Sequence, residues 1–238
     1  MEKKSKPYFS VIIPAYNEER YIGYAFAGLK QQTFKDFEAI VVYRKGNDRT
    51  AQIAGKNARV IIDKGHGVAR ARNKGAAAAR GEILLFLDAD TKPKYNLLEE
   101  YEKAFRDKEL AVATGLILPL EKRKLRIKLG YIFVSVIFVW ISIALGRPSV
   151  IGSNFAVRKK VFKKSGGFDP GLVTYEDWDL SKRLKKYGKT RIFLQARVYT
   201  STRRIDDWGM WGFFKYYVGN IFRYNFLKKP KKDYMPVR

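Results

Sequence analysis

The sequence predicts an α/β fold in which a mostly parallel sheet carries helices on both of its faces. Three features of the 238-residue chain indicate this fold. Short apolar runs recur through the first half, amphipathic or alanine-rich stretches separate them, and proline, glycine or acidic residues end them. Such runs are typical of buried strands. Strands that alternate with helices form parallel sheets, because each helix carries the chain back across the sheet.

The first half of the chain supplies five predicted strands, which lie at 9–14, 37–43, 58–63, 81–90 and 109–119. Four predicted helices separate them, at 17–32, 47–57, 67–80 and 94–107. Asn17 and Asp48 are residue types that cap helices, and Pro93 stands where we expect the fourth helix to open. In a sheet of this kind, ligands bind beyond the carboxyl ends of the strands.

The second half contains a further predicted helix at 174–188, where Thr174 and Asp177 resemble a capping box. We expect one or two strands at 189–204, because apolar and β-branched residues are frequent there. The remaining stretch, 208–234, is rich in aromatic and basic residues.

The composition narrows the classes of partner. A net charge of +25 predicts an anionic partner, which could be nucleic acid, anionic lipid headgroups or phosphorylated small molecules. A solvated surface that is simply rich in lysine is the plainer interpretation. The absence of cysteine excludes disulfides and thiolate metal sites. The first residues, MEKKSKPYFSVIIP, do not resemble a secretory signal, because their apolar run is short and contains Pro14.

Asp88 and Asp90 end the predicted strand at 81–90, with one alanine between them. Paired carboxylates at the end of a rigid strand suit a hard divalent cation such as Mg²⁺ or Mn²⁺, which takes oxygen ligands and shares them with substrate phosphates. The metal would neutralise a phosphate leaving group. A turn that uses two acids as local caps is the alternative, and the pair alone is a weak signal.

Further motifs accompany this pair in a fixed order: SVIIPAYNEE, QQTFKDFEAIVV, DRTAQIA, ARNKGAAAARGEILLFLDAD, GSNFAVRKKVF, GGFD and YEDWDLSKRLKKYG. On these stretches, which cover roughly residues 9 to 200, the chain resembles the family 2 nucleotide-sugar glycosyltransferases. The resemblance implies the GT-A fold, with a mostly parallel Rossmann-like sheet. It also implies a metal-dependent single displacement with inversion at the sugar C1, in which a nucleoside diphosphate leaves.

The resemblance assigns residues to the donor side of the site. Pro14, Tyr16 and Glu18 fall where the family's first loop meets the nucleotide, and Arg72 and Asn73 fall on its nucleotide-side helix. The family's metal and diphosphate motif matches Asp88 and Asp90, of which Asp90 is the expected direct metal ligand. Arg203 and Arg204 could hold the departing diphosphate, although a solvated basic pair is an equal alternative.

The acceptor side is assigned in the same way. Glu176 and Asp177 match the family's acidic pair near the acceptor, with Trp178 beside them. Asp177 would be the general base that takes a proton from an acceptor hydroxyl. A lipid phosphate acceptor is already an anion, and Asp177 would then orient groups instead.

One stretch departs from the family pattern. After the second strand the family usually has two aspartates, whereas this chain has Tyr43 and Arg44. The second aspartate commonly reads uracil, and an arginine cannot accept a hydrogen bond from a base N–H. A different base, an altered contact or an inactive member of the family would each explain the change.

A basic stretch at 121–128 precedes eighteen uncharged residues at 129–146, which could form a helix near the lower length limit for a membrane span. A single crossing would put the two acidic motifs on opposite sides of the membrane. We therefore expect the segment to lie in the interface, to re-enter, or to be buried against other helices. Core or dimer contact is the alternative for this segment and for the aromatic tail.

A basic stretch before an apolar helix favours the interface. The expected partners are therefore a nucleoside-diphosphate sugar, an anionic membrane surface and a lipid-linked acceptor, such as a polyprenyl phosphate or a lipid-bound glycan, without nucleic acid. The expected location is the cytoplasmic face of the cell membrane, as a peripheral or monotopic protein. Four segments follow from this scheme: a nucleotide-sugar-binding half at 1–120, a membrane-interface insertion at 121–148, an acceptor-side half at 149–204 and a membrane-contact tail at 205–238.

Three other classes of protein remain as alternatives. A nucleotidyltransferase can also place metal-binding acids on an α/β sheet. A nucleic-acid-binding protein would explain the charge and the interleaved aromatic residues, but not two acidic motifs. A non-catalytic membrane scaffold would tolerate the loss of Asp90 and Asp177.

Overall fold

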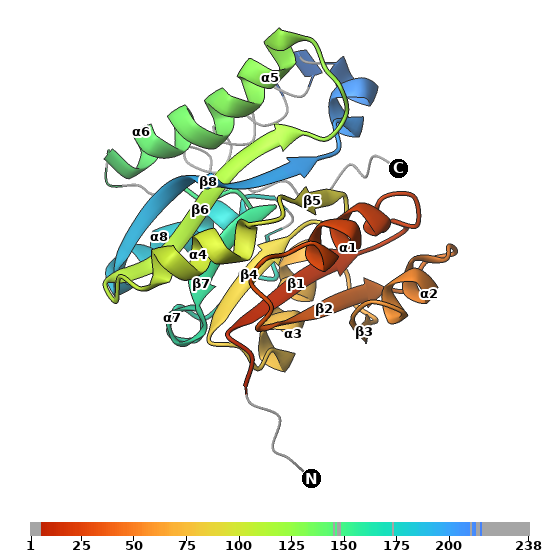
Figure 1. The fold of residues 1–238 in the computed structure, drawn as a ribbon, viewed down its shortest axis with the longest axis horizontal. Coiled ribbons are helices and arrows are strands. Elements are labelled where there is room, and N and C mark those ends of the chain that lie inside the picture. Colours follow the sequence, from red (N-terminus) through yellow and green to blue (C-terminus); the bar gives the residue numbers. More distant parts are fainter. Residues whose placement is uncertain are drawn as a thin grey trace.

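A single eight-stranded sheet forms the centre of the molecule, in the strand order β3-β2-β1-β4-β7-β6-β8-β5 (Figure 1). The computed structural model describes residues 6–144, 146, 149–172, 174–209, 211, 212 and 215. Strands from both halves of the chain interleave, because β7 lies between β4 and β6. The mixed α/β architecture is the fold class that the alternation of elements predicted.

The sheet has a parallel half and a mixed half. The parallel strands are β1 (Phe9–Ala15), β2 (Phe37–Arg44), β3 (Arg59–Asp63) and β4 (Ile83–Leu87). The mixed half contains β7 (Asn154–Arg158), β6 (Leu110–Pro119), β8 (Lys189–Thr200) and β5 (Thr91–Pro93). Strand β7 is antiparallel to both neighbours, β8 is parallel to β6, and β5 is antiparallel to β8.

Helices cover both faces of the sheet. One apolar cluster joins the sheet to α1 (Ile22–Lys30) and α4 (Leu97–Phe105). A second cluster, on the opposite face, joins it to α3 (Val68–Ala78), α7 (Lys159–Lys164) and α8 (Glu176–Leu184). Side chains alternate between faces along a strand, so Val11 and Ile13 belong to the first cluster and Ile12 to the second. The short helix α2 (Thr50–Gly55) and the 3₁₀ turn η2 (Lys185–Tyr187) complete these layers.

The strand ends and helix starts differ from the prediction at four places. Asp48 is not the N-cap of α2, because Arg49 takes that position, although Asp48 Oδ1 accepts the Thr50 N–H at 3.1 Å. Pro93 ends β5 and does not open a helix, because residues 91–93 pair with 198–200 of β8. Asn17 does not cap α1, which begins five residues later, and its φ of 54° places it in a left-handed turn. The capping box expected from Thr174 is also absent: Tyr175 precedes α8 with a φ of 71°, and no side chain caps the helix.

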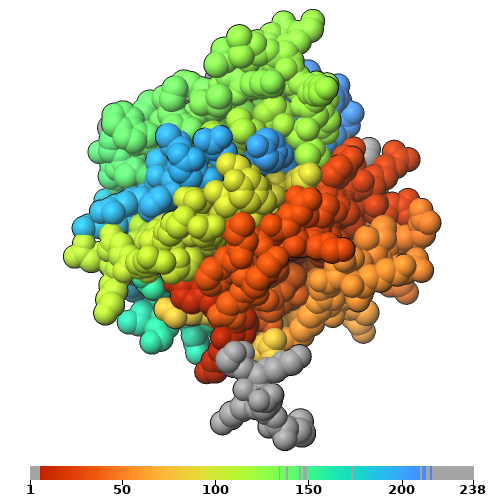
Figure 2. Space-filling view, in the orientation of Figure 1, coloured from red at the N-terminus to blue at the C-terminus, as the bar shows by residue number. Residues whose placement is uncertain are grey.

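The uncharged segment is helical from residue 129 to residue 144. Helix α5 (Leu125–Ile132) continues through a π-helical stretch η1 (Phe133–Phe138) into α6 (Val139–Ala144). This segment packs beside β6 and β8 and forms one outer edge of the molecule (Figure 2). By length and composition alone, residues 125–144 could cross a membrane, with a mean hydropathy of 2.1. Most of the predicted tail, 210, 213, 214 and 216–238, lies outside the described residues.

Candidate active site

Three carboxylates meet at the carboxyl edge of the sheet, beyond β1 and β4. The strand order places β2 and β3 on one side of β1 and β4 on the other, which makes the β1–β4 junction a topological switch point. Glu18 lies in the loop after β1, and Asp88 and Asp90 follow β4 directly. The position that sequence reasoning gave to the aspartates is therefore the place where open α/β sheets bind ligands.

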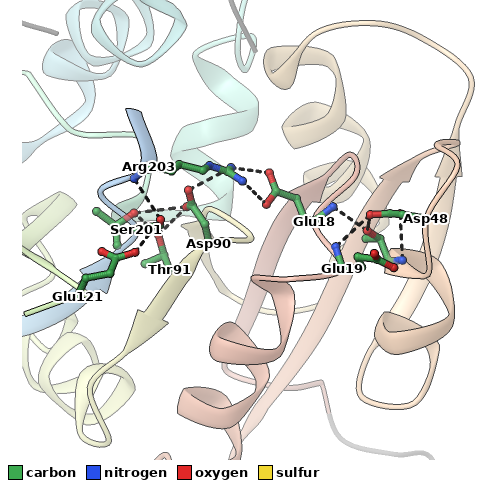
Figure 3. A network of polar contacts seen from close by, with 10 residues as sticks. Glu18, Glu19, Asp48, Asp90, Thr91, Glu121, Ser201 and Arg203 are labelled. Atoms are coloured by element: carbon green, nitrogen blue, oxygen red, sulfur yellow. Dashed lines mark hydrogen bonds and ion pairs between the residues drawn. The ribbon is translucent and has the colours of Figure 1, made fainter. Parts of the chain in front are cut away.

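Arg203 connects two of these carboxylates (Figure 3). Its guanidinium donates to both carboxylate oxygens of Glu18, with Nη1 to Oε2 at 2.8 Å and Nη2 to Oε1 at 2.6 Å. The same Nη2 lies 3.1 Å from Asp90 Oδ2. Within the described part of the chain Arg203 Nε is buried without a hydrogen-bond partner, and the guanidinium carbon lies 4.7 Å from the Tyr21 ring centroid. Arg203 is thus a fixed cation between the first loop and the end of β4.

Arg72 of α3 connects the third carboxylate to the acceptor-side acids. Its Nη2 donates to Asp88 Oδ1 at 2.9 Å and its Nη1 to Glu176 Oε1 at 2.8 Å. Arg72 is 3% exposed, so this bridge lies inside the protein. Asp88 precedes the apolar helix 125–144 and Glu176 follows it, and one side chain bonds to both. The two acidic motifs therefore belong to one site.

Burial and mutual repulsion perturb the acids of this site. Burial raises the pKa of Asp90, and the Asp88 carboxylate adds to the rise, while Arg203 opposes it. Burial also raises the pKa of Glu18, which Arg203 opposes and Asp90 and Asp88 reinforce. The site holds more negative charge than its arginines neutralise, and a bound cation would relieve this repulsion.

Glu121 is a functional candidate that sequence reasoning missed. It follows β6 and accepts hydrogen bonds from Ser201 Oγ at 3.0 Å and from the N–H and hydroxyl of Thr202 at 2.9 and 3.0 Å (Figure 3). Arg123 also donates to Thr202 Oγ1 at 2.7 Å and pairs with Asp206. These contacts fix the residues immediately before Arg203. No local motif reports them, because the partners lie about eighty positions apart.

The two acidic residues at the start of α8 have different hydrogen-bond partners. Glu176 faces Arg72, whereas Asp177 accepts the N–H of Gly152 at 3.0 Å and that of Trp178 at 2.8 Å. Burial raises the pKa of Asp177, with Arg72 and these hydrogen bonds opposing the rise. The Trp178 ring lies 5.7 Å from the Tyr175 ring, centroid to centroid. Asp177 is thus held at fixed orientation with an elevated proton affinity, which suits a general base.

The first loop is held against the loop after β2. Glu18 N–H donates to Thr50 Oγ1 at 2.7 Å, and Glu19 N–H donates to Asp48 Oδ2 at 3.0 Å. Tyr16 follows β1 beside Arg44, the last residue of β2, and the Arg44 guanidinium carbon lies 4.3 Å from the Tyr16 ring centroid. Pro14 pairs in register with Val42 of β2 and is half-buried.

Asn73 and Arg204 are the remaining predicted site residues. Asn73 exchanges two hydrogen bonds with the backbone of Phe168, at 2.7 and 2.9 Å, and so holds the GGFD stretch against α3. Arg204 follows Arg203 and lies near enough to Asp90 to lower that carboxyl's pKa, against the larger effect of burial. The structure therefore brings the acids, Arg72 and Arg203 together and gives Asn73 a supporting position.

Asp88 and Asp90 fit a divalent ion that shares its ligands with a substrate. Among the described residues, no group of three or more histidine, aspartate or glutamate side chains is arranged to hold a metal ion. Mg²⁺ commonly takes only one or two carboxylates, and phosphate oxygens and water complete its shell. The hard oxygen donors and the raised pKa of Asp90 suit such an ion.

Comparison with known sequences shows which protein family these motifs belong to. Residues 10–166 match the model of the family Glycosyl transferase family 2. The probable glycosyltransferase YdaM of Bacillus subtilis (strain 168) is 27% identical over 227 residues, which are 87% of this chain and 53% of that protein. Dolichyl-phosphate beta-glucosyltransferase of Homo sapiens is 31% identical over 138 residues, 49% of this chain and 43% of the relative. The chain spans about half the length of these two relatives.

Comparison with solved structures confirms the fold. S. aureus TarS 1-349 in complex with UDP-GlcNAc has a TM-score of 0.64 at 22% identity, over 82% of this chain and 58% of that one. Mannosyltransferase PcManGT from Pyrobaculum calidifontis, in complex with GDP-Man and Mn²⁺, has a TM-score of 0.64 at 16% identity, over 97% and 67% of the two chains. At such identities the likeness concerns the fold alone, and that fold is GT-A.

Proposed function

Because the chain belongs to glycosyl transferase family 2, we propose that it transfers a sugar from a nucleoside-diphosphate sugar to a lipid-linked acceptor at a membrane surface. The observation that carries the proposal is the position of Arg203 at the switch point of the sheet, between Glu18 and Asp90. A cation fixed there among carboxylates is suited to a diphosphate that arrives with a metal ion. A nucleotide sugar in the structure of PcManGT supports this choice of donor.

Two arginines have different parts in this mechanism. Arg203 would donate to the leaving diphosphate, because preorganised donors stabilise charge that develops in the transition state. Arg72 is 3% exposed and donates to Asp88 and Glu176, so it would orient Asp88 from inside the protein. Asp90 and Asp88 would hold Mg²⁺ or Mn²⁺, which supplies Lewis-acid neutralisation of the diphosphate.

Asp177 would take the proton of an acceptor hydroxyl at a carboxylate oxygen, while the acceptor attacks the sugar C1 from the face opposite the diphosphate. Its raised pKa makes it a stronger base than an exposed aspartate. An acceptor that is a lipid phosphate already carries negative charge and needs no base. The size of the defect in Asp177→Asn therefore distinguishes these two acceptor classes.

The exposed side of the helix 125–144 supports a membrane location. Its large exposed side chains recur at three- and four-residue spacings, which places them along one side: Leu125, Leu129, Ile132, Phe133, Ile137, Trp140 and Ile141. We call this row the apolar stripe. Exposed basic residues adjoin it, namely Lys122, Lys124, Arg126 and Lys128. An apolar stripe with adjacent basic residues suits the interface of an anionic bilayer at the cytoplasmic face. The human dolichyl-phosphate relative supports a lipid-linked acceptor.

The direct test is hydrolysis and transfer by the purified full chain in anionic vesicles. UDP-, GDP- and dTDP-sugars would be offered with Mg²⁺, Mn²⁺ or EDTA, with polyprenyl phosphate as acceptor and Asp90→Ala as control. Metal-dependent release of one nucleoside diphosphate, lost in the variant, is the expected result. Release of pyrophosphate from a nucleoside triphosphate would instead identify a nucleotidyltransferase. Binding to mixed DNA and RNA that persists at moderate salt would favour a nucleic-acid-binding protein.

A further inference from the structure

The end of β2 places an arginine next to the first loop. Residues of β1 and β2 pair in parallel register up to Ala15 and Tyr43, so Tyr16 and the last residue of β2, Arg44, follow next to one another. The Arg44 guanidinium carbon lies 4.3 Å from the centroid of the Tyr16 ring, within the range of a cation–π contact. The ring therefore holds the guanidinium in one place.

The Arg44 guanidinium has hydrogen-bonding capacity that the described residues do not use. Arg44 is half-buried, and these residues offer its side chain neither a hydrogen bond nor an ion pair. The nearby Arg49, in contrast, pairs with Glu19. A guanidinium has five N–H donors and no acceptor. The ring already holds this guanidinium in one position. Binding of a ligand that offers hydrogen-bond acceptors therefore costs little conformational entropy of the arginine side chain.

The position of Arg44 matches that of the base in a bound nucleotide. Asp88 and Asp90 mark the diphosphate position beyond β4, and β1 separates β4 from β2. Neighbouring strands lie about 4.8 Å apart, so β2 is about 10 Å from β4. A nucleotide that extends from β4 over β1 has its ribose above β1 and its base near the end of β2. Tyr43 is buried, and its hydroxyl accepts the Gly46 N–H at 2.8 Å, which leaves Arg44 as the residue of this pair that can reach a ligand.

We propose that Arg44 reads the base of the donor nucleotide and selects guanine; this rests on the proposed function. Guanine carries two adjacent acceptors, O6 and N7, which accept two N–H groups of one guanidinium. Adenine has an amino group beside N7, so the second contact is lost. In uracil an N–H separates the two carbonyl oxygens, and Arg44 has no acceptor for it.

The test measures binding, independently of transfer. Dissociation constants for GDP, UDP, ADP and CDP would be determined by calorimetry with Mn²⁺ for the full chain and for Arg44→Ala. Arg59→Ala is the matched control, since it removes one exposed positive charge from the next strand. GDP is expected to bind about tenfold or more tightly than UDP and ADP, and Arg44→Ala is expected to remove this preference. Far-UV circular dichroism would establish that each variant is folded.

The outcomes separate the inference from the function beneath it. Preference for GDP that survives in Arg44→Ala would overturn the inference. Preference for another base would do the same, as would an equal loss for all four diphosphates, which would make Arg44 a phosphate ligand. If no diphosphate binds to the folded wild-type chain, the proposed function itself is wrong.

Discussion

Arg72 and Glu176 form a buried ion pair, 2.8 Å between Nη1 and Oε1, although 104 positions separate them in the chain. The pair joins α3 to the first turn of α8 and, through Asp88, to the end of β4. It therefore contributes to both the stability of the fold and the alignment of the site, and the two contributions can be measured separately.

Replacement of Arg72 by alanine should destabilise the protein by about 3 kcal/mol, because it leaves the Glu176 carboxylate buried without its partner. Chemical denaturation measures the free energy of unfolding. Arg49→Ala, which breaks the solvent-exposed pair with Glu19, is the control and should cost at most about 1 kcal/mol. Equal effects of the two substitutions would contradict the assignment of Arg72 as an internal bridge.

The pH dependence of stability should report Glu176. Burial raises its pKa to about 7, and Asp177 adds to the rise while Arg72 opposes it. The folded state then binds a proton more tightly than the unfolded state, whose carboxyl has the ordinary value of 4.5. Stability is therefore lost as pH rises from about 4.5 to about 7, and the loss is complete above that. Unfolding measured from pH 5 to 8 should show a smaller decline in Glu176→Gln than in the wild type.

Asp177→Asn should lower kcat about 10² to 10⁴-fold with a hydroxyl acceptor, because the general base is lost while the shape of the side chain is kept. Burial raises the pKa of Asp177, so the acidic limb of the wild-type kcat/KM profile should lie above the usual aspartate value of 3.8. Activity falls as pH decreases through that limb. A profile whose acidic limb is unchanged in the variant would exclude Asp177 as the base.

Glu121→Ala should raise the KM for the donor, by up to about a hundredfold, because Ser201 and Thr202 lose the carboxylate that holds them in front of Arg203. Glu121→Gln keeps an oxygen for the Thr202 N–H and should restore part of the affinity. The control is Glu109→Ala, which removes an exposed carboxylate paired with Lys189 at the opposite end of β6. Unchanged binding of nucleoside diphosphate to Glu121→Ala would show that Arg203 does not depend on Glu121.

Trp140→Glu should reduce binding to anionic vesicles about tenfold or more, since Trp140 is 62% exposed and belongs to the apolar stripe. Ile62→Glu is the matched control, because Ile62 is 60% exposed on β3, outside the stripe. Vesicle co-sedimentation measures both variants. Equal effects of the two substitutions, or no dependence on anionic lipid, would argue that the stripe contacts protein.

Local sequence was sufficient for the framework of the fold. Each of the five apolar runs in the first half became a strand within a few residues of its predicted bounds. The signal is clearest for β4, whose residues are all buried and which therefore reads as an uninterrupted apolar run. The position of Asp88 and Asp90 beyond β4 followed from the same signal. The helix starts were harder to predict from the sequence. Asn17 and Thr174 have the residue types of caps, but Asn17 instead accepts a hydrogen bond from Asn47 N–H, and Tyr175 after Thr174 has a positive φ.

Contacts between distant residues explain what sequence reasoning missed. The strand β5 consists of three residues and exists because Thr91 and Pro93 pair with β8, more than a hundred positions later. In the sequence, Glu121 is a single acid at the start of a basic stretch. In the structure it accepts hydrogen bonds from Ser201 and Thr202, which lie about eighty positions later. The likeness of motifs assigned Arg72 to the nucleotide side, but its bond to Glu176, 104 positions later, could not be read from the local sequence.

The placement of β7 between β4 and β6 has a consequence for synthesis on the ribosome. A nascent chain cannot cover the open edge of β4 until residues 154–158 have emerged, and the apolar helix 125–144 emerges before them. An unpaired strand edge and an uncovered apolar helix are then exposed together, and each favours aggregation. Early capture of the helix by a bilayer or a chaperone would remove one of the two hazards while translation continues.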